Sequence, residues 1–301
     1  MTFQRRMAVV AFAVAASVMT AAVRAADSYK VVDGWGALAA GDTWGEVTGV
    51  DIDRSGTIIV VRRQDPPVLE FNPSGTLLKT WGTGFFNWPH GFRIDKEGNR
   101  WITDARTQNG KGQQIFKYSR DGKVLLTLGT AGVAGEGPNV FNGPCDVAFG
   151  DNGEIFVADG HVGSRVAKFS RDGTFITSWG TKGSGPGQFN TPHAIAIDSK
   201  GRVFVADRGN KRIQIFDENG TFLDQWTQFG RPSGLLITAD DMLYVADVEE
   251  KPGISYGSVK DGIVRGTITG TLPESIAIGR DGAVYAGETT TGHILRKFVK
   301  P

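Results

Sequence analysis

Hydrophobic residues along this chain gather in short alternating stretches that come in pairs around polar turns. In one pair, AIAID (194–198) and VFVAD (203–207) flank a Ser-Lys-Gly turn. Alternation of this kind is typical of half-buried β-strands, and a glycine-containing turn between two such stretches predicts a hairpin. The pattern therefore predicts antiparallel β structure, and no long helical pattern is visible after Ala25.

The hairpins repeat with a fixed internal spacing. A proline precedes each hairpin, and an acidic residue follows it 15 positions later. The spacing occurs in five pairs: Pro89/Asp104, Pro144/Asp159, Pro192/Asp207, Pro232/Asp247 and Pro273/Glu288. Repetition of one small unit indicates a repeat architecture, in which each unit buries its apolar face against its neighbours.

Two further strands are expected after each hairpin. RIQIF (212–216) and TFLDQW (221–226), for example, are separated by an Asn-Gly turn, and these residues tolerate the positive φ angles of tight turns. Four antiparallel strands per unit are the pattern of a β-propeller blade. With a first, degenerate unit at 47–62, the sequence predicts an all-β, six-bladed β-propeller in a single domain (26–301).

The last unit shows only three evident strands before the sequence ends. We expect its fourth strand to be YKVVDGW (29–35), so that the ring is closed by the N-terminal strand. Closure of this kind removes the exposed sheet edges that would otherwise invite aggregation.

The segment before Ala26 has a different composition from the rest. Arg5 and Arg6 precede an apolar run (7–23) that ends in Val-Arg-Ala, the pattern of a secretory signal peptide (1–25). We therefore expect a secreted or periplasmic protein that has no membrane contact after signal cleavage. An uncleaved anchor is the alternative interpretation.

Composition narrows the classes of partner. The formal net charge of +1 does not favour nucleic acid. The outer blade faces show no long apolar stripe, so a monomer is expected. Cys145 is the only cysteine, which excludes an internal disulfide, and we expect it to be a small packed residue rather than a nucleophile.

The residue after each hairpin proline takes the same place in every blade, at the mouth of the central channel. Around the ring this position holds Thr48, His90, Cys145, His193, Ser233 and Glu274. His90, His193 and Glu274 fall in alternate blades, about 120° apart around the axis of a six-bladed ring. Two imidazoles and a carboxylate suit a catalytic zinc ion or another divalent metal. The alternative is that the histidines only hydrogen-bond the facing strands.

Three further residues could complete a reactive site. Arg63 and Arg208 lie just past strand ends and could hold a substrate carboxylate in a forked contact. Ion pairs between blades would explain them equally well. His161 occupies the corresponding loop of the third blade, where it could move a proton near neutral pH or simply face solvent.

The sequence also resembles a known family. The segment from Pro144 to Phe216 looks like the NHL-repeat propellers. More narrowly, the chain looks like the catalytic core of peptidyl-α-hydroxyglycine α-amidating lyase. The matching segments, in order, are WPHG (88–91), DGHVGSR (159–165), FNTPH (189–193) and VADRGNKRIQ (205–214). The similarity covers nearly all of the chain after the leader.

The resemblance implies roles for individual residues. Two of the family's three zinc-binding histidines match His90 and His193, and Glu274 stands in place of the third. The family's catalytic tyrosine matches His161, and its substrate-binding arginines match Arg63 and Arg208. A structural calcium of the family uses an aspartate, and this chain has a serine at that position, Ser275.

The family reaction would cleave a carbinolamide, N–CH(OH)–COO⁻, to an amide and a glyoxylate-like acid. We therefore expect a secreted, metal-dependent lyase acting on a small-molecule or peptide substrate. Two alternatives stay open. One is a non-catalytic NHL propeller that binds a protein, peptide or glycan, and the other is a propeller lactone hydrolase.

Overall fold

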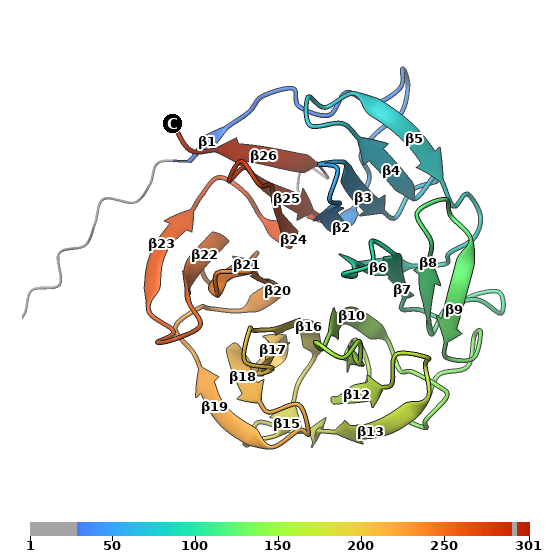
Figure 1. Cartoon of the computed structure of the whole chain (residues 1–301), viewed down its shortest axis with the longest axis vertical. Coiled ribbons are helices and arrows are strands. Elements are labelled where there is room, and N and C mark those ends of the chain that lie inside the picture. The colour runs from blue at the N-terminus through green and yellow to red at the C-terminus, as the bar shows by residue number, and fades with distance from the viewer. Residues whose placement is uncertain (1–28, 291–293) are drawn as a thin grey trace, which may run out of the picture.

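Six four-stranded antiparallel sheets surround a central channel in the computed structural model, which describes residues 29–290 and 294–301 (Figure 1). The predicted all-β, six-bladed propeller is confirmed. The expected signal peptide (1–25) lies outside the described residues. Among those residues, no helix has the length and apolarity needed to cross a membrane.

The first three blades follow one another in sequence, each with its innermost strand first. Blade one contains β2 (Val47–Ile52), β3 (Ile58–Arg62), β4 (Val68–Phe71) and β5 (Leu77–Trp81). Blade two contains β6 (Pro89–Ile94), β7 (Arg100–Asp104), β8 (Gln114–Tyr118) and β9 (Val124–Leu128). Blade three contains β10 (Pro144–Phe149), β11 (Ile155–Asp159), β12 (Arg165–Phe169) and β13 (Phe175–Trp179).

The remaining blades complete the ring. Blade four contains β16 (Pro192–Ile197), β17 (Val203–Asp207), β18 (Arg212–Phe216) and β19 (Phe222–Trp226). Blade five contains β20 (Pro232–Ile237), β21 (Met242–Asp247), β22 (Gly253–Ser258) and β23 (Val264–Ile268). Blade six contains β24 (Pro273–Ile278), β25 (Val284–Glu288), β26 (Leu295–Val299) and β1 (Lys30–Val31).

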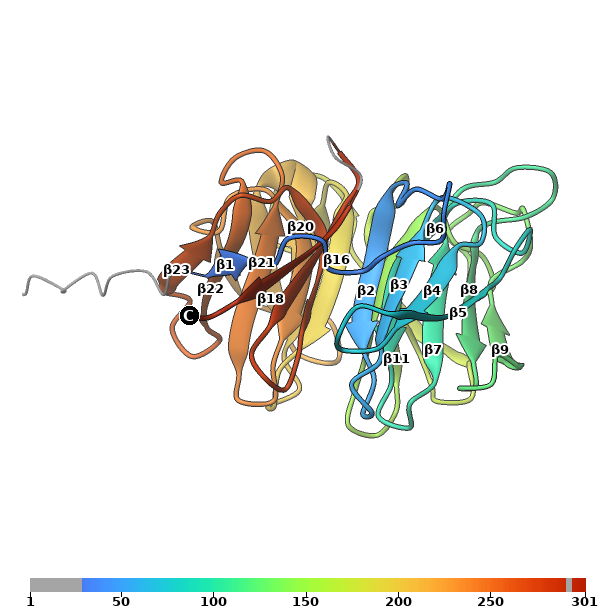
Figure 2. The same ribbon diagram turned by 90° about the horizontal axis from the view of Figure 1, so that it is seen from above.

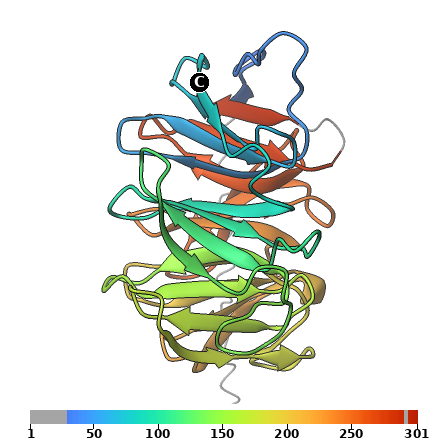
Figure 3. The same cartoon turned by 90° about the vertical axis from the view of Figure 1, so that its right-hand side faces the viewer.

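The outermost strand of blade six comes from the other end of the described chain. Lys30 pairs with Val299 and Val31 with Phe298, so β1 lies beside β26 (Figure 1). Only two residues of the segment expected to form this strand (29–35) are extended. Side views show the ring as a disc whose strands run from one face to the other (Figures 2 and 3).

Short elements fill the joint between blades three and four. The strands β14 (Thr181–Lys182) and β15 (Gln188–Phe189) pair in parallel, and a single 3₁₀ turn, η1 (Arg208–Asn210), follows β17. These elements lie at the same ends of the strands as the blade prolines. They therefore contribute to the face on which the candidate site opens.

The 15-residue spacing of the sequence has a direct structural cause. The proline and the acidic residue are cross-strand partners at the open end of the first hairpin, as in Pro192 opposite Asp207. In each of the five hairpins with this spacing, the acid accepts a hydrogen bond from a backbone N–H one or two residues before the proline, whereas blade one has Arg62 at the position of the acid. These donors are Asn87 and Trp88 for Asp104, Asn142 for Asp159, Asn190 for Asp207, Arg231 for Asp247 and Leu272 for Glu288. The repeated acid thus fastens each inter-blade loop to its blade.

Apolar side chains pack between adjacent blades and form the core. Between blades three and four, Phe156, Phe189, Val205 and Phe216 are each no more than 1% exposed. Full burial of one such side chain stabilises the fold by roughly 1.5–3 kcal/mol. Because each blade packs in this way only on its neighbours, the inner strands are held rigidly around the channel.

Candidate active site

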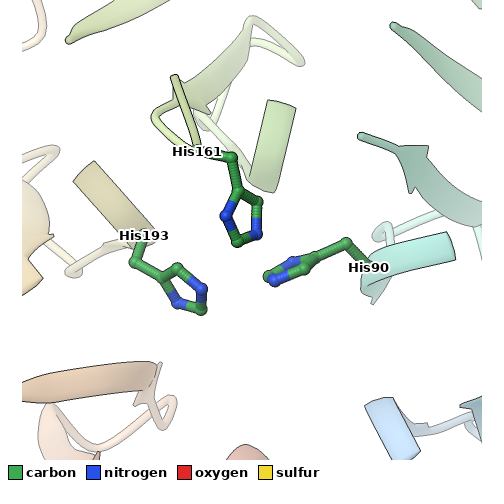
Figure 4. A group of neighbouring side chains, drawn as sticks. All are labelled: His90, His161 and His193. Carbon is green, nitrogen blue, oxygen red and sulfur yellow. The ribbon is translucent and has the colours of Figure 1, made fainter. Parts of the chain in front are cut away.

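His90 and His193 begin the innermost strands β6 and β16, directly after the blade proline. The pairing register shifts at this point, between Pro89 and Phe92 in blade two and between Pro192 and Ala194 in blade four. Such bulges re-aim a side chain, and here both imidazoles point toward the channel axis (Figure 4).

Residues at the channel mouth are linked from blade to blade by hydrogen bonds. The Nδ1 atom of His90 lies 2.9 Å from the carbonyl of Cys145, and that of His193 lies 2.7 Å from the carbonyl of Ser233. The Ser233 hydroxyl donates in turn to the carbonyl of Pro273 at 2.8 Å. Since a carbonyl only accepts, both histidines carry a proton on Nδ1, and the Nε2 atom of each faces the axis.

His161 reaches the same point from a different element. It lies in the loop after β11, where its backbone N–H donates to the carbonyl of Gly143 at 3.0 Å. Its ring centroid is 4.5 Å from that of His90 and 5.2 Å from that of His193. One ring nitrogen from each of the three histidines lies within 4.8 Å of the others. Figure 4 shows the three rings pointing toward one another.

Two of these ring nitrogens have no partner within the described structure. The Nε2 atoms of His90 and His161 are buried and make no hydrogen bond. A buried polar atom without a partner is costly, and its presence in a native protein calls for a ligand, an ion or an ordered water. These two nitrogens therefore mark a position that something else is expected to fill.

Glu274, at the start of β24 in blade six, faces the histidines from the opposite side of the ring. Its Oε1 atom lies 3.4 Å from His90 Nε2, 3.3 Å from His193 Nε2 and 3.7 Å from Nη1 of Arg208. Burial raises the pKa of this carboxyl, but His90 and the charges of Arg208 and Arg63 outweigh burial and lower the pKa below its usual value. Glu274 is therefore a carboxylate at neutral pH.

Two of the imidazoles, those of His161 and His193, are held neutral. Burial lowers the pKa of His161, and the neighbouring His90 and His193 lower it further. Burial and the charge of Arg208 likewise hold the pKa of His193 well below 6.5. A neutral imidazole with an available lone pair is the form that binds a metal ion or accepts a proton.

Arg208 follows β17 and enters the same cluster. Its Nη1 donates to the Nε2 atom of His193 at 2.9 Å, and its side chain is 20% exposed. Arg208 therefore contacts the cluster on one side and solvent on the other. From this position, Arg208 could exchange its hydrogen bond to His193 for a contact with an anionic ligand that enters at the channel mouth.

Arg63 lies farther from the cluster and stacks on the indole of Trp88. Its Nη1 pairs with Glu46, and its guanidinium carbon lies 3.4 Å from the centroid of the Trp88 ring. Trp88 itself packs edge-on against His161, with ring centroids 4.9 Å apart. Burial lowers the pKa of Arg63, although the ion pair with Glu46 opposes that shift.

Trp88 and Glu46 were the residues missed from sequence. The aromatic residue directly before Pro89-His90 was a visible signal, because it adjoins the position that had already been assigned to the channel mouth. Glu46 takes the same place in blade one, directly before Val47, but the degenerate first unit lacks the proline that marks this position in the other blades.

The channel below the histidines already contains a side-chain cation. Arg93 donates to both carboxylate oxygens of Asp146, at 3.0 and 2.6 Å, and to the carbonyl of Leu235 in blade five at 2.8 Å. The hydroxyl of Ser275, which replaces the family's calcium-binding aspartate, is buried without a partner. The donor set that a structural calcium would require is incomplete here.

Cys145 has the packing that the sequence indicated. It is fully buried, its sulfur contacts the carbonyl of Gly143 at 3.4 Å, and burial raises the pKa of its thiol. A thiol in this state is not a nucleophile near neutral pH. Its contribution to the site is its backbone carbonyl, which orients His90.

The residues proposed from sequence thus lie together at one mouth of the channel. His90, His161, His193, Glu274 and Arg208 form one cluster, and Arg63 stands behind Trp88. The donor chemistry fits a divalent metal, because three imidazoles and one carboxylate converge and two ring nitrogens make no hydrogen bond. His161 lies about as close to the other two histidines as they lie to each other, so its position suits a metal ligand and a proton acceptor alike.

Comparisons with known protein families agree with the repeat. A model of the NHL repeat matches residues 189–216, and a model described as strictosidine synthase-like, N-terminal, matches residues 266–297. Among solved structures, a streptogramin B lyase superposes with a TM-score of 0.65 at 15% identity, covering 92% of this chain and all of that one. At this identity the likeness shows the fold alone.

Curated relatives are closer in sequence. Peptidyl-glycine alpha-amidating monooxygenase B of Xenopus laevis is 32% identical over 248 residues, 75% of this chain and 28% of that protein. Peptidyl-alpha-hydroxyglycine alpha-amidating lyase 1 of Drosophila melanogaster is 32% identical over 220 residues, 60% of this chain and 40% of that protein. The chain therefore spans less than half the length of either.

A third relative is matched over most of its length. NHL repeat-containing protein 3 of Mus musculus is 34% identical over 258 residues, which are 78% of this chain and 74% of that protein. The chain is thus a six-bladed propeller that belongs to the family of NHL-repeat proteins, and its homologues include peptidyl-α-hydroxyglycine α-amidating lyases.

Proposed function

We propose that this protein is a metal-dependent lyase that cleaves the N–C bond of a carbinolamide carrying a carboxylate. The products are an amide and a glyoxylate-like acid. The observation that carries the proposal is the convergence of three imidazoles and Glu274 on one point, with two buried ring nitrogens that make no hydrogen bond. The lyase relatives add support, and the leader favours action after export to the periplasm or the medium.

His90, His193 and Glu274 are assigned to the metal. Their donor atoms already face one another, and the Nδ1 hydrogen bonds of the two histidines fix the tautomer that a ligand needs. A zinc or other divalent ion bound there would supply a Lewis acid that makes a substrate hydroxyl group more acidic.

His161 is assigned to the proton transfer. Its unpartnered Nε2 is available to accept the proton of the substrate hydroxyl. As the O–H electrons form the new carbonyl, the bond from carbon to the amide nitrogen breaks. His161 then returns the proton to that nitrogen, so the enzyme ends the cycle unchanged.

Arg208 and Arg63 are assigned to the substrate carboxylate. Arg208 is the nearer of the two, and it would exchange its hydrogen bond to His193 for one to the incoming carboxylate. A metal ion on the lone pair of His193 would displace Arg208 from that nitrogen, which would leave its guanidinium group available to the carboxylate. Arg63 would add its charge from behind Trp88.

Glyoxylate release from N-benzoyl-α-hydroxyglycine tests the proposal, with δ-gluconolactone as the substrate of the competing lactone-hydrolase class. We expect turnover of the first compound only. His161→Phe should lower kcat at least about a hundredfold, the usual contribution of a positioned acid–base group. Val162→Ala, in the same loop and 72% exposed, is the matched control. Absence of glyoxylate from the metal-loaded protein would overturn the lyase assignment.

One observation favours a second candidate, a non-catalytic propeller that binds anionic groups. Arg208 already occupies the lone pair of His193 at 2.9 Å, which would satisfy that nitrogen without a metal. The match to an NHL repeat-containing protein over 74% of its length is also compatible with a binding role. A protein that binds acyl-glycines but contains no metal would support this candidate.

A further inference from the structure

Trp88 lies between two arginines at the edge of the candidate site. The guanidinium carbon of Arg63 is 3.4 Å from the centroid of its ring, and that of Arg106 is 3.8 Å from it. Two guanidinium groups cannot share one face of an indole at these distances, so they lie on opposite faces. The two cations therefore lie against the same indole and are separated by its ring.

The charges of this stack are not balanced. Glu46 pairs with Arg63, whereas no carboxylate pairs with Arg106 among the residues that the structure describes. The charge of Arg106 also contributes to lowering the pKa of Arg63, after the larger effect of burial. An exposed cation held close to a second cation leaves net positive charge, which an anionic group would stabilise.

The stack is fixed in place rather than loosely attached. The backbone N–H of Trp88 donates to the buried Asp104 at 2.5 Å, and its carbonyl accepts from Ala105 at 3.1 Å. The side-chain amide of Asn87 donates to the carbonyl of Arg106 at 2.6 Å. Both the indole and the loop that carries Arg106 are therefore pre-organised before any ligand binds.

The stack adjoins the reaction centre. Trp88 touches His161 on one edge, with centroids 4.9 Å apart, and the tilted ring of His90 lies 5.4 Å away. A recess lined by residues that include Arg63, Phe86 and Asn87 opens beside Arg63. A ligand whose first carboxylate reached the histidine cluster could thus extend its other end past Trp88.

We propose that Arg106, held on Trp88 opposite Arg63, is a specificity-determining residue that binds a second acidic group of the substrate. The preferred ligands are then acyl derivatives of α-hydroxyglycine whose acyl part ends in a carboxylate. The assignment of the first carboxylate to Arg208 rests on the proposed function. The preference for a second one rests on the Arg63–Trp88–Arg106 stack.

Binding of unreactive analogues tests this subsite without turnover. N-succinylglycine and its terminal carboxamide have nearly the same shape and differ by one charge, and neither carries the hydroxyl that the lyase reaction needs. Titration calorimetry on the whole protein should give a Kd about tenfold lower for the dianion, the effect of one charge-assisted hydrogen bond. Quenching of tryptophan fluorescence should follow the same titration and be lost in Trp88→Phe.

Arg106→Gln should remove most of this preference and change the Kd of the carboxamide much less, whereas Arg106→Lys should retain part of it. Arg120→Gln is the matched control, because it removes the same charge from a turn where Arg120 pairs with Asp53. Equal binding of the two analogues by the wild-type protein, or an unchanged preference in Arg106→Gln, would overturn the subsite. Either result is independent of glyoxylate release, so failure of the subsite and failure of the lyase assignment can be told apart.

Discussion

At the open end of the first hairpin of a blade, the residues on the two strands differ in how far they are repeated around the ring. On the second strand, the acids Asp104, Asp159, Asp207, Asp247 and Glu288 are all buried and all accept a backbone N–H from the preceding loop. On the first strand, the residue after the proline is also buried but differs from blade to blade. The same backbone geometry therefore serves stability on one strand and leaves the other strand free to carry the candidate site.

The difference shows how a repeat separates structure from function. A side chain with the same partner in every unit is needed by the unit itself, so its repetition says nothing about catalysis. A position whose backbone is uniform but whose side chain varies is free to carry a site. In this ring, the variable position brings His90, His193 and Glu274 to one point.

The largest expected effect lies at the repeated acid. Asp207 accepts from Asn190 N, Arg212 Nε and Asn210 Nδ2, at 2.7, 2.8 and 2.8 Å. Asp207→Ala should lower the free energy of unfolding by about 3–5 kcal/mol, because it leaves the buried Arg212 without its carboxylate and removes the acceptor of two further donors. Chemical denaturation measures this loss. Asp151→Ala, at a carboxylate that is 88% exposed, should change it by less than about 0.5 kcal/mol.

Acid should destabilise the metal-free protein, because His161 is held neutral in the folded state. His161 has a pKa below the ordinary value of 6.5, so the unfolded chain takes up a proton below pH 6.5 that the folded chain does not. Its contribution to stability is therefore present above pH 6.5 and lost as the pH falls. Relative to His161→Phe, the wild-type protein should lose about 1.5–2 kcal/mol between pH 6.5 and 5.

The comparison with His161→Phe is needed because other groups titrate in the same range. Burial raises the pKa of Asp159 to about 6, which shifts the stability in the opposite direction. This contribution is common to both proteins and cancels in the difference, which denaturation in the presence of a chelator would measure. A difference that does not change with pH would show that His161 is protonated in the folded protein.

A substitution at Arg208 should act on binding before it acts on stability. Arg208→Gln should raise KM for a carboxylate substrate about ten- to a hundredfold, the range expected for one charge-assisted contact. Thermal unfolding of the variant should stay close to that of the wild-type protein, because the side chain is partly exposed. An unchanged KM would remove Arg208 from the substrate site.

The smallest effect is expected at Ser233, a position equivalent to His193 without its chemistry. Its hydroxyl donates to the carbonyls of Pro273 and Ala246, at 2.8 and 3.1 Å. Ser233→Ala should cost about 1 kcal/mol of unfolding free energy, the typical net value of a hydrogen bond. A loss as large as that expected for Asp207→Ala would mean that this position too is structural, which would weaken the comparison.

The fold and the location of the site could be predicted because both follow from the repeat. The spacing from Pro192 to Asp207 is a hairpin, and its recurrence fixes the number of blades and the shared position of His90 and His193. The proximity of Glu274 also follows from this ring geometry, although His90 lies in blade two and Glu274 in the last blade.

The contacts that lie outside the repeated positions could not be predicted. Trp88 and Glu46 precede their hairpins, and the sequence contains no rule for where Arg63 would pack. The hydrogen bond from Arg208 to His193 depends on the 3₁₀ turn at 208–210, which among the described residues occurs in blade four alone. Such details arise from loop conformation, and periodicity carries no information about it.

Metal content tests the central claim most directly. The protein, purified without chelators or affinity-tag metal, would be measured by elemental analysis together with His193→Ala and the control Asp151→Ala. We predict about one divalent ion per chain in the wild-type protein and the control, and loss of that ion in His193→Ala. Absence of a stoichiometric metal, or its retention in His193→Ala, would contradict a metal site at the channel mouth.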